Sequence, residues 1–280
     1  MSESGRDARN PAELAGPPAA PGGQPPDLTD EALSGEVAEL VGQLAEEPTP
    51  SRVRRLQAAA FRLARRGGRA GWSGVRSSGR VGWSGVRSGG RWLTSQTLAL
   101  APRLPIRDQQ TLRAQFPGLD PEELADALIQ GSARAAASVG AAVGAAMFLP
   151  LPAAPVEVAV ETLGLVGIEV KLVAELHEVY GMRAPGPAPE RALAYLAAWA
   201  HRRGVSVAPG GLVLAVGSPL RRRLERRLLV RAGRSAASLG PLLTGAAAGA
   251  LLNRQETRRL GHDVRHDLRR RSAQGDRWPR

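Results

Sequence analysis

Two histidines near the C-terminus have a spacing that helical metal sites use. His262 and His266 are four residues apart, and Asp263 and Asp267 each follow one of them. On a helix this spacing puts both imidazoles on one face, where they could hold a divalent cation. Two ligands do not make a secure site, and the spacing implies no third. Because the segment is heavily charged, we interpret it as solvated surface and predict no metal site.

The remaining acid–base candidates lie between residues 155 and 181. His177 stands close to an acidic helical face formed by Glu157, Glu161, Glu175 and Glu178. Paired carboxylates could act as acid and base, but no Glu-x-x-His spacing accompanies them. We interpret the face as a polar stripe that meets basic helices of the same chain, and His177 as a helix-end residue.

The sequence lacks residues and motifs that several classes of enzyme require. The chain has no cysteine, which excludes disulfides, thiolate metal sites and cysteine nucleophiles. It also lacks a Gly-x-x-x-x-Gly-Lys-Ser/Thr loop, a Gly-x-Ser-x-Gly elbow and a His-Glu-x-x-His motif. We therefore predict that the protein is not an enzyme and has no catalytic residue and no cofactor. No small-molecule substrate is evident.

A repeated motif supplies the main candidate binding surface. The sequence GWSGVRS at residues 71–77 recurs unchanged at residues 82–88, eleven residues later. Eleven residues are three helical turns, so the arginines of this region would form one stripe bordered by tryptophans. We predict that this stripe binds an anionic surface through Arg62, Arg65, Arg66, Arg69, Trp72, Arg76, Arg80, Trp83, Arg87 and Arg91. Nine glycines between residues 67 and 90 disfavour a helix, so a flexible linker stays an alternative.

The net charge of +12 is unevenly distributed. Residues 51–107 contain thirteen arginines and no acid, and residues 218–280 contain sixteen arginines and five acids. Residues 108–190 are acidic on balance. Basic segments of this kind fit an anionic membrane surface or an acidic membrane partner. The alternative is nucleic acid, with arginines on phosphates and Trp72 and Trp83 stacked on bases.

Composition favours an all-α fold, because Ala, Leu, Val and Gly carry the apolar content and there are only three Phe, two Tyr and five Trp. Thr29 is a predicted N-cap, and the helix after it ends near Glu47. Further helices are predicted from Ser51 onward and over residues 107–116, 189–203, 219–237 and 254–271. We divide the chain into a disordered tail (1–27), an acidic helix with the basic segment (28–106), a helical core domain (107–272) and a disordered C-terminus (273–280).

The best local signal in the chain is Asp120-Pro121-Glu122-Glu123, an N-cap with proline at the first helical position. It starts a long helix to about residue 148, and a return helix runs from Pro155 to a Gly181 C-cap. The sequence thus predicts a bundle around an Ala/Gly-rich antiparallel helical hairpin, whose small residues let its arms approach closely. Counting from the turn at Leu151 puts Arg134 near Glu169, so we predict an ion pair.

The uncharged run between Arg134 and Glu157 is nominally long enough to cross a bilayer. It is only weakly apolar, and the return helix carries acids that do not face lipid tails. We predict a buried hairpin, with membrane insertion as the alternative. No signal peptide is visible, which favours a cytoplasmic location.

Two blocks carry a family resemblance. The first runs from Ala141 through Pro155 to Gly181 and ends in ELHEVYG, and the second is GPLLTGAAAGALLN at residues 240–253. Together they are similar to EcsC-type bacterial proteins, over about half of the chain. The resemblance implies a helical, membrane-associated protein on the cytoplasmic side with no settled enzymatic activity. We therefore predict a non-enzymatic, membrane-peripheral protein at the inner face of the membrane.

Overall fold

The computed structural model describes residues 29–71, 83–146, 154–208, 211–214 and 242–275, and side chains within 29–66, 91–142, 161–205 and 247–275. The all-α class is confirmed. The helices are α1 (Asp30–Glu46), α2 (Pro50–Gly71), α3 (Trp83–Leu100), α4 (Gln109–Gln115), α5 (Pro121–Ala146), α6 (Ala154–Val179), α7 (Ala188–Arg203) and α9 (Leu242–Ala273). A 3-10 turn, η3 (Ala101–Arg103), follows α3.

One short hairpin that we did not predict follows α7. Strand β1 (Val205–Ala208) pairs antiparallel with β2 (Gly211–Leu214), with Val205 opposite Leu214. The predicted disordered tail (1–27) and the predicted helix over 219–237 lie outside the described residues.

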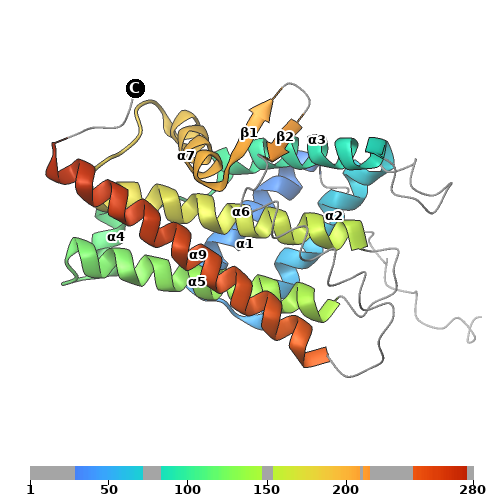
Figure 1. Cartoon of the computed structure of the whole chain (residues 1–280), viewed down its shortest axis with the longest axis horizontal. Helices are drawn as coiled ribbons and strands as arrows, with labels where there is room; N and C mark the ends of the chain where they lie inside the picture. Colours follow the sequence, from blue (N-terminus) through green and yellow to red (C-terminus); the bar gives the residue numbers. More distant parts are fainter. Residues whose placement is uncertain (1–28, 72–82, 147–153, 209–210, 215–241, 276–280) are drawn as a thin grey trace, which may run out of the picture.

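Helix α6 lies at the centre of the molecule (Figure 1). Every residue from 161 to 179 is buried except the half-buried Thr162. Helices α1, α2, α5, α7 and α9 all pack against it. A helix that is apolar on most sides is expected to be enclosed in this way. One hydrophobic cluster contains Leu33 and Leu56 together with Leu128 and Leu172, so it spans the boundary that we predicted at residue 106.

Local signals in the sequence set several helix ends. Thr29 Oγ1 accepts a hydrogen bond from the Ala32 amide at the start of α1. At the start of α5, the Glu123 amide donates to Asp120 Oδ1 (2.8 Å) and the Asp120 amide donates to Glu123 Oε2 (3.0 Å), which forms a capping box. Gly204 adopts a left-handed conformation (φ 61°) directly after α7. The predicted starts of α1 and α5 and the predicted end of α7 are therefore confirmed.

Helices α5 and α6 contact each other and run in opposite directions (Figure 1). The turn predicted at residues 149–152 lies outside the described residues. Helix α5 packs more extensively against α9 than against α6. Where α5 and α9 meet, a Cβ atom placed on Gly249 would lie 2.6 Å from the carbonyl oxygen of Gly140. This close small-residue contact thus joins α5 to α9, whereas we expected such contacts between α5 and α6.

Candidate functional site

Several helix ends meet at one end of the molecule. The last turns of α2 and α5 and the first turns of α3, α6 and α9 all lie on the same side, at the right in Figure 1. We define the convergent end as residues 61–71, 83–91, 135–146 and 242–252. The two basic stretches, 61–71 and 83–91, are far in sequence from 135–146 and 242–252, and the packing of their helices around α6 brings them together.

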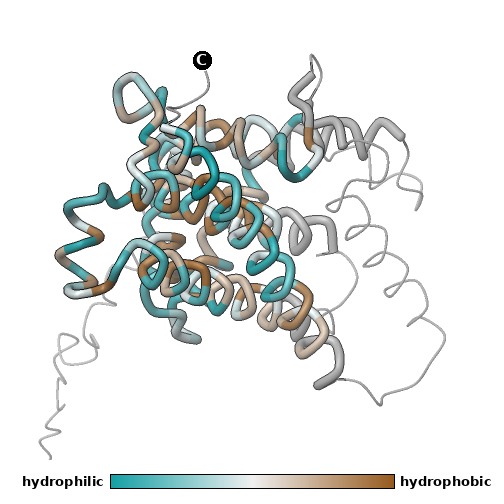
Figure 2. The backbone as a smooth tube through the Cα atoms, turned by 60° about the vertical axis from the view of Figure 1, so that its left-hand side comes forward, coloured by the Kyte–Doolittle hydropathy of each residue, from teal (hydrophilic) through white to brown (hydrophobic). Residues whose placement is uncertain are grey.

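The convergent end combines uncharged and basic segments. Residues 135–146 and 242–252 contain no charged residue, and the α2 and α3 stretches contain arginines but no acid. Figure 2 shows the matching change along the coloured part of α9, whose first turns are hydrophobic or neutral and whose later turns are mostly hydrophilic. Leu251 in α9 is 65% exposed, and Phe61 in α2 is 38% exposed. Exposed apolar side chains beside arginines are typical of surfaces that meet lipid headgroups.

Part of the predicted arginine stripe has partners within the chain. Arg62 lies 2.6 Å from a carboxylate oxygen of Glu36, and Arg66 Nε lies 3.6 Å from Asp30 Oδ1. Helix α1 therefore neutralises two positions that we assigned to anion binding. Arg65 is exposed, with its guanidinium 5.7 Å from the centre of the Phe61 ring.

The rest of the stripe is only partly described. Arg91 is exposed on α3. The second copy of the repeat is helical from Trp83 onward, because α3 begins there. The first copy beyond Gly71 lies outside the described residues, as do the side chains of Arg69, Trp72, Arg76, Arg80, Trp83 and Arg87. The helical eleven-residue period therefore stays a prediction.

The predicted ion pair between Arg134 and Glu169 is not formed. Glu169, only 1% exposed, is held by Arg203 of α7, whose Nε donates over 3.0 Å and whose Nη2 also bonds to it. Trp199 Nε1 (2.9 Å) and Thr257 Oγ1 (3.0 Å) donate to the same carboxylate. Glu169 faces α7 and α9, whereas Arg134 is exposed on α5. Counting outward from the turn gave the wrong partner because it ignored the rotation of each helix.

A second buried cluster surrounds Glu175. Arg107 donates to this carboxylate through Nε and Nη2, both over 2.7 Å. Lys171 bonds to it from one turn earlier and also donates to the Pro105 carbonyl over 2.6 Å. Burial lowers the pKa of Lys171, and the charge of Glu175 opposes that shift. Glu175 therefore meets basic residues of the same chain, although they come from α6 itself and from the segment before α4 and not from the basic helices that we expected.

The end of α6 shows the same pattern of paired groups. Glu178 accepts from Arg183 Nε (2.8 Å) and lies 3.4 Å from the Tyr195 hydroxyl. Burial lowers the pKa of His177 to about 4, and its Nδ1 lies 2.7 Å from the Val173 carbonyl oxygen. His177 is therefore neutral at pH 7 and packed inside the bundle.

The histidine pair of α9 lies at the surface. His262 is half-buried and His266 is exposed, and Asp267 bonds to Arg202 (2.5 Å) and Arg270 (2.8 Å). Within the described ranges, no three His, Asp or Glu side chains are grouped as metal ligands would be.

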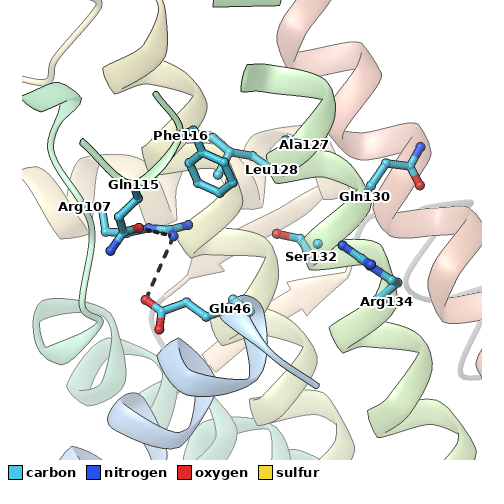
Figure 3. A pocket seen from close by; sticks show the side chains of 11 residues that line it. Glu46, Arg107, Gln115, Phe116, Ala127, Leu128, Gln130, Ser132 and Arg134 are labelled. Atoms are coloured by element: carbon cyan, nitrogen blue, oxygen red, sulfur yellow. Dashed lines mark hydrogen bonds and ion pairs between the residues drawn. The ribbon is translucent and has the colours of Figure 1, made fainter. Parts of the chain in front are cut away.

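Sequence reasoning missed a pocket of about 340 Å³ between the end of α1, α4 and α5 (Figure 3). Its wall includes Arg107, Phe116, Ser132 and Arg134. These residues come from separate segments and share no motif, so no signal in the sequence could have grouped them.

Comparison with protein-family models, curated proteins and solved structures finds no match to this chain. The resemblance to EcsC-type proteins therefore stays a prediction. Within the part of the chain that the structure describes, none of the helices combines the length and the apolar character needed to cross a bilayer.

Proposed function

We propose that this chain is a non-enzymatic, membrane-peripheral helical protein of the cytoplasmic side that binds anionic lipid, or an acidic membrane partner, through the convergent end. The observation that supports this most is the meeting of the uncharged ends of α5 and α9 with the arginine-rich ends of α2 and α3. One contribution is apolar and the other is electrostatic. Stable peripheral binding generally needs two such signals.

The magnitudes of the two contributions are compatible with reversible binding. A basic side chain near an anionic membrane contributes about 1 kcal/mol. Full burial of a leucine side chain contributes about 1.5–3 kcal/mol, and Leu251 is 65% exposed in the free protein. Phe61 would add a third contact, because its ring can enter the headgroup region of the membrane while Arg65, which lies over the ring, stays close to the lipid phosphates.

The opposite end of the molecule has a different charge arrangement. There, Arg265 of α9 bonds to Asp126 of α5, and Arg202 of α7 bonds to Asp267. Acids pair with arginines at both ends, because Glu36 and Asp30 pair with Arg62 and Arg66 at the convergent end. The ends differ in that the α5 and α9 stretches of the convergent end contain no acid, whereas the start of α5 brings several acids to the opposite end. This difference supports the convergent end as the face that meets the membrane.

Vesicle co-sedimentation of the full chain tests the proposal. We expect binding to vesicles of phosphatidylcholine mixed with phosphatidylglycerol, retained in part at moderate salt, and weak binding to phosphatidylcholine alone. Leu251→Glu should weaken binding by about tenfold, because it replaces an exposed apolar contact with a charge that anionic lipid repels. Leu119→Glu is the matched control, since Leu119 is 39% exposed and lies two residues before α5, at the other end of the bundle.

The same salt series with random duplex DNA examines the alternative partner. Lipid binding that salt abolishes, together with tight DNA binding, would contradict the membrane proposal and favour nucleic acid. Equal losses from Leu251→Glu and Leu119→Glu would contradict the assignment of the convergent end.

A further inference from the structure

The pocket between α1, α4 and α5 has the shape and lining of a small-ligand site. Its volume of about 340 Å³ falls at the lower end of the range for pockets that hold small molecules. Phe116, Leu128 and Ala45 form apolar parts of the wall, and Arg107 and Arg134 bring positive charge to it (Figure 3). The convergent end contributes no residue to this lining.

Ser132 is the first indication of a ligand. It is 4% exposed, and its hydroxyl forms no hydrogen bond with any residue that the structure describes. Other helical serines of this chain satisfy their hydroxyls locally: Ser138 donates to the Arg134 carbonyl (2.9 Å) and Ser34 to the Asp30 carbonyl (2.8 Å). Figure 3 shows the Ser132 oxygen pointing into the pocket, towards the side of Arg107 and Phe116. A buried hydroxyl without a partner is uncommon and costs stability unless something bonds to it.

Arg107 is fixed in place before any ligand arrives. Glu175 holds its Nε and Nη2, and its Nη1 donates to Gln115 Oε1 over 2.8 Å. A guanidinium held in this way loses little side-chain freedom when it bonds to a further acceptor.

Arg134 supplies a second cation with no partner in the described residues. It is exposed, forms no ion pair with them, and in Figure 3 its guanidinium extends towards Ser132. One carboxylate, Glu46, itself lines the pocket, 3.9 Å from Arg107 and with half of its side chain exposed. Glu175 and Glu46 together do not cancel the charge, because Glu175 also pairs with Lys171 and the three cations Arg107, Arg134 and Lys171 outnumber the two acids.

We infer that this pocket binds a small organic phosphate, with the phosphate between Arg134, Arg107 and the Ser132 hydroxyl and the organic part against Phe116. Guanidinium groups donate charge-assisted hydrogen bonds to phosphate oxygens, and a hydroxyl can donate one more. The phosphate could belong to a soluble metabolite or to a lipid headgroup. This inference goes beyond the proposed function and does not rest on it.

Calorimetric titration of the full chain with glycerol 3-phosphate tests the inference. We expect saturable binding that Ser132→Ala weakens about tenfold and Arg134→Gln weakens at least tenfold. Arg113→Gln is the matched control, because Arg113 is an exposed arginine of α4 that does not line the pocket and should not change binding. Leu251→Glu should not change it either, which separates this test from that of membrane binding.

Ser132→Ala has a second readout. If the Ser132 hydroxyl bonds only to a ligand, it is buried without a hydrogen bond in the ligand-free protein and lowers its stability. Removal of the hydroxyl should then raise the melting temperature in phosphate-free buffer. A hydroxyl with a structural role would give the opposite shift.

Short-chain phosphatidylglycerol, tested below its micelle concentration, distinguishes the two sources of the phosphate. Tighter binding of the lipid than of glycerol 3-phosphate, lost in Arg134→Gln, supports a headgroup site, and equal or weaker binding supports a soluble ligand. The inference is overturned if neither compound binds saturably, or if Arg134→Gln and Arg113→Gln have equal effects.

Discussion

At the scale of single residues, two buried carboxylates of α6, Glu169 and Glu175, are held by arginines from distant parts of the chain. Arg203 reaches Glu169 across 34 residues of sequence, and Arg107 reaches Glu175 across 68. A buried carboxylate is stable only when its oxygens accept enough hydrogen bonds, and both of these accept at least two from arginine. Because the bonds come from different sides, they fix the rotation of α6 inside the bundle.

His177 gives a residue-scale prediction about pH. Its pKa is lowered from 6.5 to about 4, chiefly by burial, and Arg202 and Arg271 add to the shift. Between these pH values the unfolded chain binds a proton that the folded chain does not, so the free energy of unfolding should fall as the pH decreases from 6.5 to 4. The loss attributable to His177 is at most about 3 kcal/mol and is absent above pH 6.5.

Urea unfolding of the wild type and of His177→Gln at several pH values between 7 and about 4 measures this effect. The variant should have a clearly flatter dependence on pH. His266→Gln, which alters an exposed histidine of α9, should keep the slope of the wild type. Parallel curves for all three proteins would show that burial does not lower the pKa of His177.

At the scale of helices, the contact between α5 and α9 depends on glycine. A Cβ atom at Gly140 would collide with the Gly249 backbone and lie 2.6 Å from Asn253 Nδ2, so Gly140→Ala must push the two helices apart. We expect it to lower the free energy of unfolding by about 1–3 kcal/mol, even though alanine favours helix. Gly35→Ala in α1 is the control, since no atom lies within 4 Å of the added carbon.

Thermal and urea unfolding of the two variants should therefore show changes of opposite sign. Gly35→Ala should raise the free energy of unfolding by about 0.5–1 kcal/mol, through helix propensity alone. A stabilising effect of Gly140→Ala would mean that α5 and α9 do not approach each other this closely.

Local chemistry explains which elements could be predicted from the sequence. The N-caps Thr29 and Asp120 and the left-handed Gly204 act through bonds to neighbouring residues, so their types and positions are sufficient signals. The start of helix α9 was predicted wrongly, at residue 254. The apolar run before that residue and the charged stretch after it differ in composition, but they form one continuous helix from Leu242 to Ala273. Change of composition along a helix reflects what each part packs against and does not mark its end.

Tertiary packing decided what could not be predicted. Arg134 and Glu169 lie on faces of α5 and α6 that point to different neighbours, and only the three-dimensional arrangement shows this. The pocket likewise joins Arg107, before α4, to Ser132 and Arg134 of α5. Strand β1 is four residues long, which is too short for a pattern of alternating side chains to be distinctive.

At the scale of the whole molecule, the bundle separates its charge along its length. At one end, acids of α5 meet arginines of α9, as Asp126 does with Arg265. At the convergent end, uncharged stretches of α5 and α9 lie with arginine-rich stretches of α2 and α3. This arrangement predicts a preferred orientation on an anionic surface, with the convergent end towards the lipid.

A single fluorescent label tests that orientation most directly, because the chain has no cysteine of its own. Leu251→Cys and Leu119→Cys, each labelled with a polarity-sensitive dye, would be mixed with vesicles containing phosphatidylglycerol. The proposed orientation predicts a blue shift and brighter emission from the label at residue 251 and little change at residue 119. An unchanged spectrum at residue 251 while the protein sediments with the vesicles, or a shift at residue 119 alone, would contradict it.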